Sequence, residues 1–148
     1  FDAVSRSYKY CITHTKNPFS DGLSLLNWGN FDSNKMNDAA VLLLKHKNFQ
    51  SFSKSKSDLH NFRCDISYAY WKRENNMDVF YITSNRFLRG MVRAIVGTLI
   101  KISNNKLNIN DFNNIILSKN ISNASSLVPA HGLFFTAVQY PFKLIPLS

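Results

Sequence analysis

The chain has 148 residues, of which 45% are hydrophobic and 14% aromatic, so it is about one domain with enough apolar surface to bury a core. This composition excludes a disordered linker. No apolar run reaches the roughly 20 residues of a membrane-spanning helix, because Arg89, Arg93 and Lys101 interrupt the longest ones, and we expect no membrane contact. Eighteen Lys and Arg against nine Asp and Glu give a net charge of +9. That imbalance favours nucleic acid as a partner, unless a compositional bias toward Asn and Lys explains it.

The first predicted element is a strand. Side chains alternate over residues 6–13, which is the period of a half-buried strand, and this places Arg6 and Tyr8 on one face. The segment 17–30 contains one proline and two glycines, so it predicts an irregular connection.

A helix is expected next, and a loop after it. Asp32 or Ser33 can cap a helix that ends near His46. Its predicted apolar positions recur at three- and four-residue steps and are Met36, Ala39, Ala40, Leu43 and Leu44. Residues 51–57 are polar, basic and low in complexity, so they predict a mobile loop.

An antiparallel hairpin follows this loop. Residues 62–72 and 77–83 are rich in strand-forming side chains, and the pair Asn75 and Asn76 between them suits a tight turn. The rest of the chain predicts a long helix over residues 86–101, a shorter one near 110–117, and a last strand over 133–140 closed by a proline.

This order of elements predicts the fold class. Strands and helices in irregular order, with hairpin-type connections, indicate an α+β domain in which a mainly antiparallel sheet carries its helices on one face. We expect no second domain within residues 1–148.

The long predicted helix carries a basic face. At about 100° per residue, one sector of it would hold Arg86, Arg89, Gly90, Arg93, Gly97 and Lys101. Arginines beside glycines leave little steric bulk and favour a face that contacts phosphates or carboxylates. The alternative is an ordinary solvated helix face.

Two other segments suggest a nucleotide site. Arg6 and Tyr8 would put a cation beside an aromatic ring on one rigid strand, although Tyr8 could equally be a core aromatic. In the segment 129–135, a loop enters a strand, where Gly132 would supply backbone geometry and Leu133 an apolar wall.

The remaining residue types argue against a self-sufficient enzyme. No carboxylate pair suggests general acid and base chemistry, and the chain lacks a Gly-rich phosphate loop, a nucleophile elbow and a Cys/His dyad. Cys11 and Cys64 lie far apart in apolar stretches and predict buried thiols of a reducing compartment. The four histidines show no metal-ligand spacing, so we predict no metal site.

Four segments, read in order, share the pattern of one family over nearly the whole chain. They are FDAVSRSYKY at 1–10, NFQSF at 48–52, NRFLRGMVRAIVGTL at 85–99 and VPAHGLFFTAVQYP at 128–141. In these segments the chain resembles the bacterial tRNA pseudouridine synthase A (TruA-type) family, and it looks like the carboxyl-terminal half of such an enzyme.

The resemblance implies a function and a set of residues. Such enzymes isomerise uridines at positions 38 to 40, in the anticodon stem-loop of tRNA, using a catalytic aspartate and no cofactor; they are cytoplasmic and homodimeric. That aspartate belongs to the amino-terminal half and has no match here, so the fragment alone is expected to be inactive. The matching positions make Tyr8 the tyrosine against the base, Arg93 the partner of the aspartate, and Leu133 the residue that packs on the uracil. Arg6, Arg86 and Arg89 are the predicted RNA contacts.

Two alternatives stay open at this point. The chain could be a non-catalytic RNA-binding module on the same scaffold, or a basic structural domain that binds an acidic protein.

Overall fold

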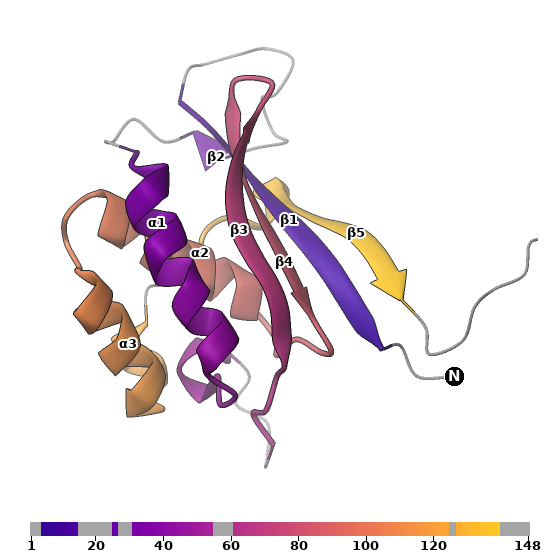
Figure 1. The fold of residues 1–148 in the computed structure, drawn as a ribbon, viewed down its shortest axis with the longest axis vertical. Coiled ribbons are helices and arrows are strands. Elements are labelled where there is room, and N and C mark those ends of the chain that lie inside the picture. Colours follow the sequence, from indigo (N-terminus) through magenta and orange to yellow (C-terminus); the bar gives the residue numbers. More distant parts are fainter. Residues whose placement is uncertain (1–3, 15–24, 27–30, 55–60, 125–126, 140–148) are drawn as a thin grey trace, which may run out of the picture.

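The computed structural model describes residues 4–14, 25–26, 31–54, 61–124 and 127–139. These residues form a five-stranded sheet with three α-helices on one of its faces (Figure 1). The α+β class with a mainly antiparallel sheet is therefore confirmed. Among the described residues, no helix is long and apolar enough to cross a membrane, and no three His, Cys, Asp or Glu side chains gather in a way that could hold a metal ion.

The central strand of the sheet is β1 (Ser5–Thr13), as predicted. One of its edges pairs antiparallel with β4 (Met77–Ser84), which in turn pairs with β3 (Ile66–Glu74). Its other edge pairs antiparallel with β5 (Leu133–Gln139) and, at the far end, parallel with the short β2 (Leu25–Leu26). The strand within the predicted irregular connection was not expected. The rest of that connection, and the proline expected to close β5, lie outside the described residues.

The predicted hairpin is confirmed. Asn75 and Asn76 have φ angles of 49° and 63°, and this pair of left-handed residues makes the tight turn that two twisted strands favour. β3 begins at Ile66 and not at residue 62, because the preceding residues pair elsewhere: the Cys64 amide donates to the Lys47 carbonyl at 2.9 Å.

Helix α1 (Ser33–Ala40) begins at the predicted cap, where the Asp32 side chain accepts a hydrogen bond from the Lys35 amide. The chain then tightens into a 3₁₀ turn, Val41–Lys45, so the helical segment ends next to His46 as predicted. The tighter winding carries Leu44 off the buried stripe, where it is 37% exposed. The expectation for Leu44 was wrong for this reason.

The loop predicted over residues 51–57 is wrong in its first part. Gln50–Phe52 forms a 3₁₀ turn in which Ser51, Phe52 and the following Ser53 are buried. The Ser51 hydroxyl donates to the Ile115 carbonyl of α3 at 2.6 Å, so this serine is a packing residue. Residues 55–57 of this prediction lie outside the described part.

Helix α2 (Met91–Ser103) starts five residues later than the pattern predicted. Gly90 has a φ of 71°, a left-handed conformation that breaks the α-helix at its first turn. Arg86 and Arg89 therefore precede the helix, and the predicted single basic face does not exist. Gly97, expected on that face, is buried.

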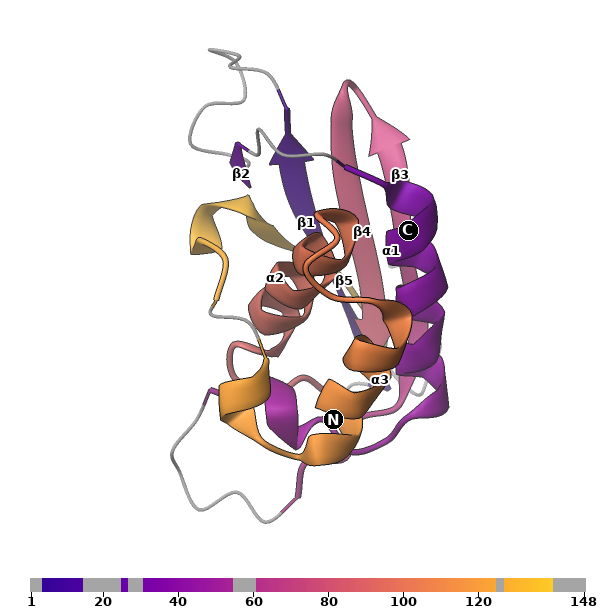
Figure 2. The ribbon, with the colours of Figure 1, turned by 90° about the vertical axis from the view of Figure 1, so that its left-hand side faces the viewer.

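The helices pack together over one side of the sheet. α1 lies along β3, α2 lies next to α1, and α3 (Ile109–Ser118) packs on the outside of this pair (Figure 2). α3 matches the shorter predicted helix. The core between helices and sheet is rich in aromatic rings. Among them are Trp71 and Phe80, whose ring centroids are 5.0 Å apart. Cys11 and Cys64 are free and buried, as predicted.

Candidate functional site

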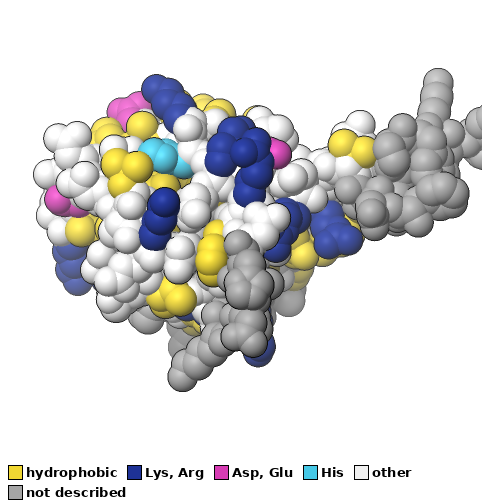
Figure 3. Space-filling view, turned by 90° about the horizontal axis from the view of Figure 1, so that it is seen from below, with side chains coloured by type: hydrophobic (Ala, Val, Ile, Leu, Met, Phe, Trp, Pro, Cys, Tyr) yellow, Lys and Arg dark blue, Asp and Glu magenta, His cyan; other side chains and the backbone are white. Residues whose placement is uncertain are grey.

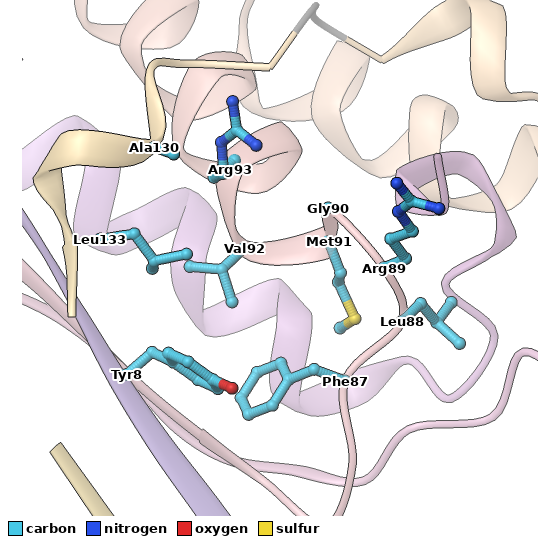
Figure 4. Close-up of a pocket in the computed structure, with 10 residues that line it drawn as sticks. All are labelled: Tyr8, Phe87, Leu88, Arg89, Gly90, Met91, Val92, Arg93, Ala130 and Leu133. Carbon is cyan, nitrogen blue, oxygen red and sulfur yellow. The ribbon is translucent and has the colours of Figure 1, made fainter. Parts of the chain in front are cut away.

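A cavity of about 490 Å³ lies where β1, the start of α2 and the start of β5 come together (Figure 4). Its lining residues are Tyr8, Phe87, Leu88, Arg89, Gly90, Met91, Val92, Arg93, Ala130 and Leu133. Four of the six predicted site residues are therefore brought together: Tyr8, Arg89, Arg93 and Leu133.

Tyr8 stands on the rigid centre of the sheet. Its ring makes edge-to-face contacts with Phe87 at 5.1 Å and with Phe135 at 5.4 Å between ring centroids. In Figure 4, the Tyr8 and Phe87 rings lie side by side along one wall, and Leu133, Val92 and Arg93 lie across from them. The cavity thus has an aromatic wall opposite an aliphatic one, which suits a flat ring.

Arg93 extends from the first turn of α2. Its Nε–H donates to the Val128 carbonyl at 2.8 Å, and the Val128 amide donates to the Arg93 carbonyl at 3.4 Å. The segment before β5 is therefore fastened to α2. Because Nε accounts for one of the five guanidinium N–H groups, the two terminal amino groups retain the geometry for a bidentate contact.

The turn that precedes α2 depends on Gly90. A Cβ there would lie 3.0 Å from Lys54 Cγ and 3.2 Å from Leu127 Cδ2, in addition to the left-handed φ. The Lys54 amide also donates to the Arg89 carbonyl at 3.0 Å. Close packing on both sides of Gly90 thus fixes the turn, and the exposed Arg89 projects from it at the rim of the cavity.

The described lining is basic. It contains Arg89 and Arg93 and neither Asp nor Glu. Nearby, burial lowers the pKa of Lys54 below its usual range. A cavity of this charge can attract a phosphate or a carboxylate, and its described lining contains no Asp, Glu, His or Cys that could act as a general base or nucleophile.

The other two predicted RNA contacts lie outside the cavity. Arg6 is exposed near the start of β1. Arg86 donates to the Asn61 and Arg63 carbonyls at 3.0 and 3.2 Å, so part of its hydrogen-bonding capacity holds the chain before β3. Figure 3 shows one end of the molecule, where Lys and Arg side chains cover more of the visible surface than Asp and Glu.

Sequence reasoning missed Phe87 and Tyr10. Phe87 lies within the range 86–101 that was expected to be helical, but it precedes α2. Tyr10 lies two residues after Tyr8 on β1, and its hydroxyl donates to the Pro129 carbonyl at 2.6 Å. Burial raises the pKa of Tyr10 to about 12. No periodicity marks this contact, because its partner is 119 residues away.

The comparisons with known proteins agree with one another. The family model described as tRNA pseudouridine synthase matches residues 39–141. A tRNA pseudouridine synthase A from Porphyromonas gingivalis is 46% identical over 146 residues, which are 97% of this chain and 58% of that protein. Proteins of the same name from Parabacteroides distasonis and Bacteroides fragilis are 43% and 42% identical, over 59% and 58% of their lengths. This chain therefore spans somewhat more than half the length of these relatives, and it belongs to the tRNA pseudouridine synthase family.

Proposed function

We propose that this chain is the carboxyl-terminal half of a tRNA pseudouridine synthase and forms one wall of its active site. The longer protein that would contain it is termed the full-length synthase below. The observation that carries the proposal is the meeting of Tyr8, Arg93 and Leu133, from three distant segments, in one basic cavity whose described lining has no carboxylate. Such a cavity is suited to a carboxylate supplied by another part of the protein.

The roles of these residues follow from the chemistry of uridine isomerisation. The base must leave its stack, detach from the sugar, turn and rejoin through carbon. Tyr8 and Leu133 would hold the ring between an aromatic and an apolar side chain. Arg93 would keep the catalytic aspartate ionised and oriented through two parallel hydrogen bonds. The isomerisation has no net redox change and so consumes no oxidant or reductant, and we propose that it uses no cofactor.

Charge supports tRNA as the substrate. Because the chain has a net charge of +9, its binding to tRNA would be favoured by the release of counterions from the RNA phosphates. We assign Arg6, Arg86 and Arg89 to such phosphate contacts. The proposed region of modification is the anticodon stem-loop. A cytoplasmic homodimer is the proposed setting.

The test compares the purified 148-residue chain with the full-length synthase on tRNA whose uridines carry tritium at C5. Tritium release from uracil C5 measures the reaction, and a filter-binding assay measures affinity. We expect the short chain to bind tRNA weakly and to release no tritium, and the full-length synthase to release it. Turnover by the short chain would refute the division of roles, and an inactive full-length synthase would refute the function itself.

A second candidate is a non-catalytic RNA-binding module, which the absence of a carboxylate from the described lining also supports. On this alternative, the longer protein never forms pseudouridine. Its affinity for tRNA is the same with and without substitutions at Tyr8, Arg93 and Leu133.

A further inference from the structure

The segment between Leu127 and Leu133 is fastened at two consecutive carbonyl groups. Arg93 Nε donates to the Val128 carbonyl at 2.8 Å, and the Tyr10 hydroxyl donates to the Pro129 carbonyl at 2.6 Å. Because proline has no amide hydrogen, its carbonyl is the only backbone polar group through which Pro129 can be held. Tyr10 therefore supplies the hydrogen bond available at that residue.

Tyr10 controls the other end of the segment as well. Its backbone pairs with Leu133 in the register of β1 and β5. Between the two ends, the turn Ala130–Gly132 lies directly on the Tyr10 ring: a Cβ at Gly132 would be 2.8 Å from Tyr10 Cζ and 3.1 Å from the Cys11 carbonyl oxygen. Only a residue without a side chain allows so close an approach.

Tyr10 itself does not line the cavity, and it is fully buried. Its effect on a ligand must pass through the residues that it holds. Leu133 follows the turn Ala130–Gly132 directly, and Arg93 is hydrogen-bonded to the same segment at the Val128 carbonyl. A shift of this segment would therefore move the aliphatic wall and the guanidinium together, relative to Tyr8 on the rigid strand.

We infer that Tyr10 is a positioning residue of this site: its hydroxyl fixes the segment 128–133 and thereby the positions of Leu133 and Arg93 against the flipped base. The inference rests on the proposed function. Misplacing groups at the reacting centre by up to about 1 Å can slow the reaction of a bound substrate by up to about a hundredfold. Under the proposed function, phosphate contacts away from this segment supply most of the affinity, so Tyr10 should influence the chemical step and not tRNA binding.

The test is Tyr10→Phe in the full-length synthase, with Tyr81→Phe as a matched control. Both substitutions remove one tyrosine hydroxyl that donates a hydrogen bond, but Tyr81 donates to Glu74 and lies away from the cavity. The single-turnover rate, the affinity for tRNA and amide hydrogen exchange over 128–133 are measured for each. We expect Tyr10→Phe to lower the rate roughly tenfold with affinity within about twofold of wild type, and to speed exchange in the segment. Tyr81→Phe should change none of the three.

Gly132→Ala is the second variant and serves if Tyr10→Phe folds poorly. It crowds the turn against the Tyr10 ring although the hydroxyl is retained, so the same selective loss of rate is expected. An unchanged rate in both variants, or a loss of affinity as large as the loss of rate, would overturn the positioning role. The proposed function fails separately, if wild-type full-length synthase forms no pseudouridine.

Discussion

At the scale of single residues, Arg93 shows how one side chain can serve the fold and the proposed site together. Its Nε–H is used by the Val128 carbonyl, and this bond orients the plane of the guanidinium. The terminal amino groups are then presented at a fixed angle. A lysine has no group equivalent to Nε, and its charge lies on one rotatable ammonium. It could therefore fully replace neither the hydrogen bond to Val128 nor the bidentate contact.

The first prediction concerns Arg93 in the full-length synthase. Arg93→Lys should reduce the single-turnover rate at least about a hundredfold while tRNA affinity stays nearly intact, because a point charge cannot hold a carboxylate in two-pronged fashion. Arg93→Ala leaves that carboxylate without its cation, which raises its pKa. The deprotonated carboxylate then forms only at higher pH, so the rising limb of the pH–rate profile should shift to higher pH.

The measurement is the single-turnover rate as a function of pH for both variants, beside tRNA affinity. A defect in affinity alone, with an unmoved pH profile, would identify Arg93 as a phosphate contact.

The second prediction separates Arg86 from Arg89 in the 148-residue chain. Arg89 is exposed at the rim of the cavity, so Arg89→Ala should weaken tRNA binding and flatten its salt dependence without loss of stability. Arg86→Ala should in addition lower the free energy of unfolding by about 1 kcal/mol, since it removes hydrogen bonds to two backbone carbonyls. Gel shifts at several salt concentrations and urea denaturation measure the two effects, and equal stability of the two variants would contradict the distinction.

At the scale of elements, the ends of helices and the turns follow short-range chemistry. Asp32 caps α1 and Asn75–Asn76 closes the β3–β4 hairpin, both as the sequence predicted. The start of α2 was mispredicted because the apolar periodicity continues from Phe87 through the turn. Leu88 is buried although it lies before the helix, so the pattern of burial did not mark the break at Gly90.

The third prediction tests the start of α3. Asn108 accepts from the Asp111 amide at 2.8 Å, and Asp111 accepts from the Asn108 amide at 2.9 Å, which is a reciprocal capping box. Asn108→Ala should lower the free energy of unfolding by about 1 kcal/mol. The control is Asn110→Ala, an exposed position in the first turn of the same helix, where alanine should be neutral or slightly stabilising. Urea denaturation measures both, and an equal response at the two positions would rule out the cap.

At the scale of the whole molecule, the described helices pack over one face of the sheet, and among the described strands β5 pairs only with β1 (Figure 1). Phe135 is 55% exposed and Val138 is 38% exposed on this strand, whereas the strands under the helices carry the buried core. The cavity lies where β1, the first turn of α2 and the start of β5 meet (Figure 4). Access of a large ligand or of another part of the protein to this cavity is what the proposed function requires.

The fourth prediction concerns alkaline pH and the whole fold. Burial raises the pKa of Tyr10 and of Tyr81 to about 12, with a hydrogen bond to Glu74 adding to the effect at Tyr81, and burial raises the pKa of Cys64 to about 11. Each folded pKa lies above the unfolded value, so the protonated side chains stabilise the fold at neutral pH. That stability is lost as pH rises from about 9 for the thiol and about 10 for the phenols, up to the folded values.

Urea denaturation between pH 8 and 11.5 should therefore show a free energy of unfolding that falls above about pH 9. In Tyr81→Phe, the decline should be shallower, because one titrating group is gone. A constant free energy across this range would contradict the assignment of these three side chains.

The sequence by itself determined the fold class, the order of the three helices and of the strands β1, β3, β4 and β5, the cap of α1, the hairpin turn, and Tyr8, Arg93 and Leu133 as candidate site residues. These depend on local propensity and periodicity, or on segments whose pattern matches a family. Only the tertiary structure decided that Arg86 and Arg89 do not share a helix face, that Ser51–Ser53 is buried, and that Tyr10 holds the Pro129 carbonyl. The physical reason is that these features arise from contacts between residues far apart in the chain, whose geometry depends on the packing of whole elements and leaves no periodic trace in the sequence.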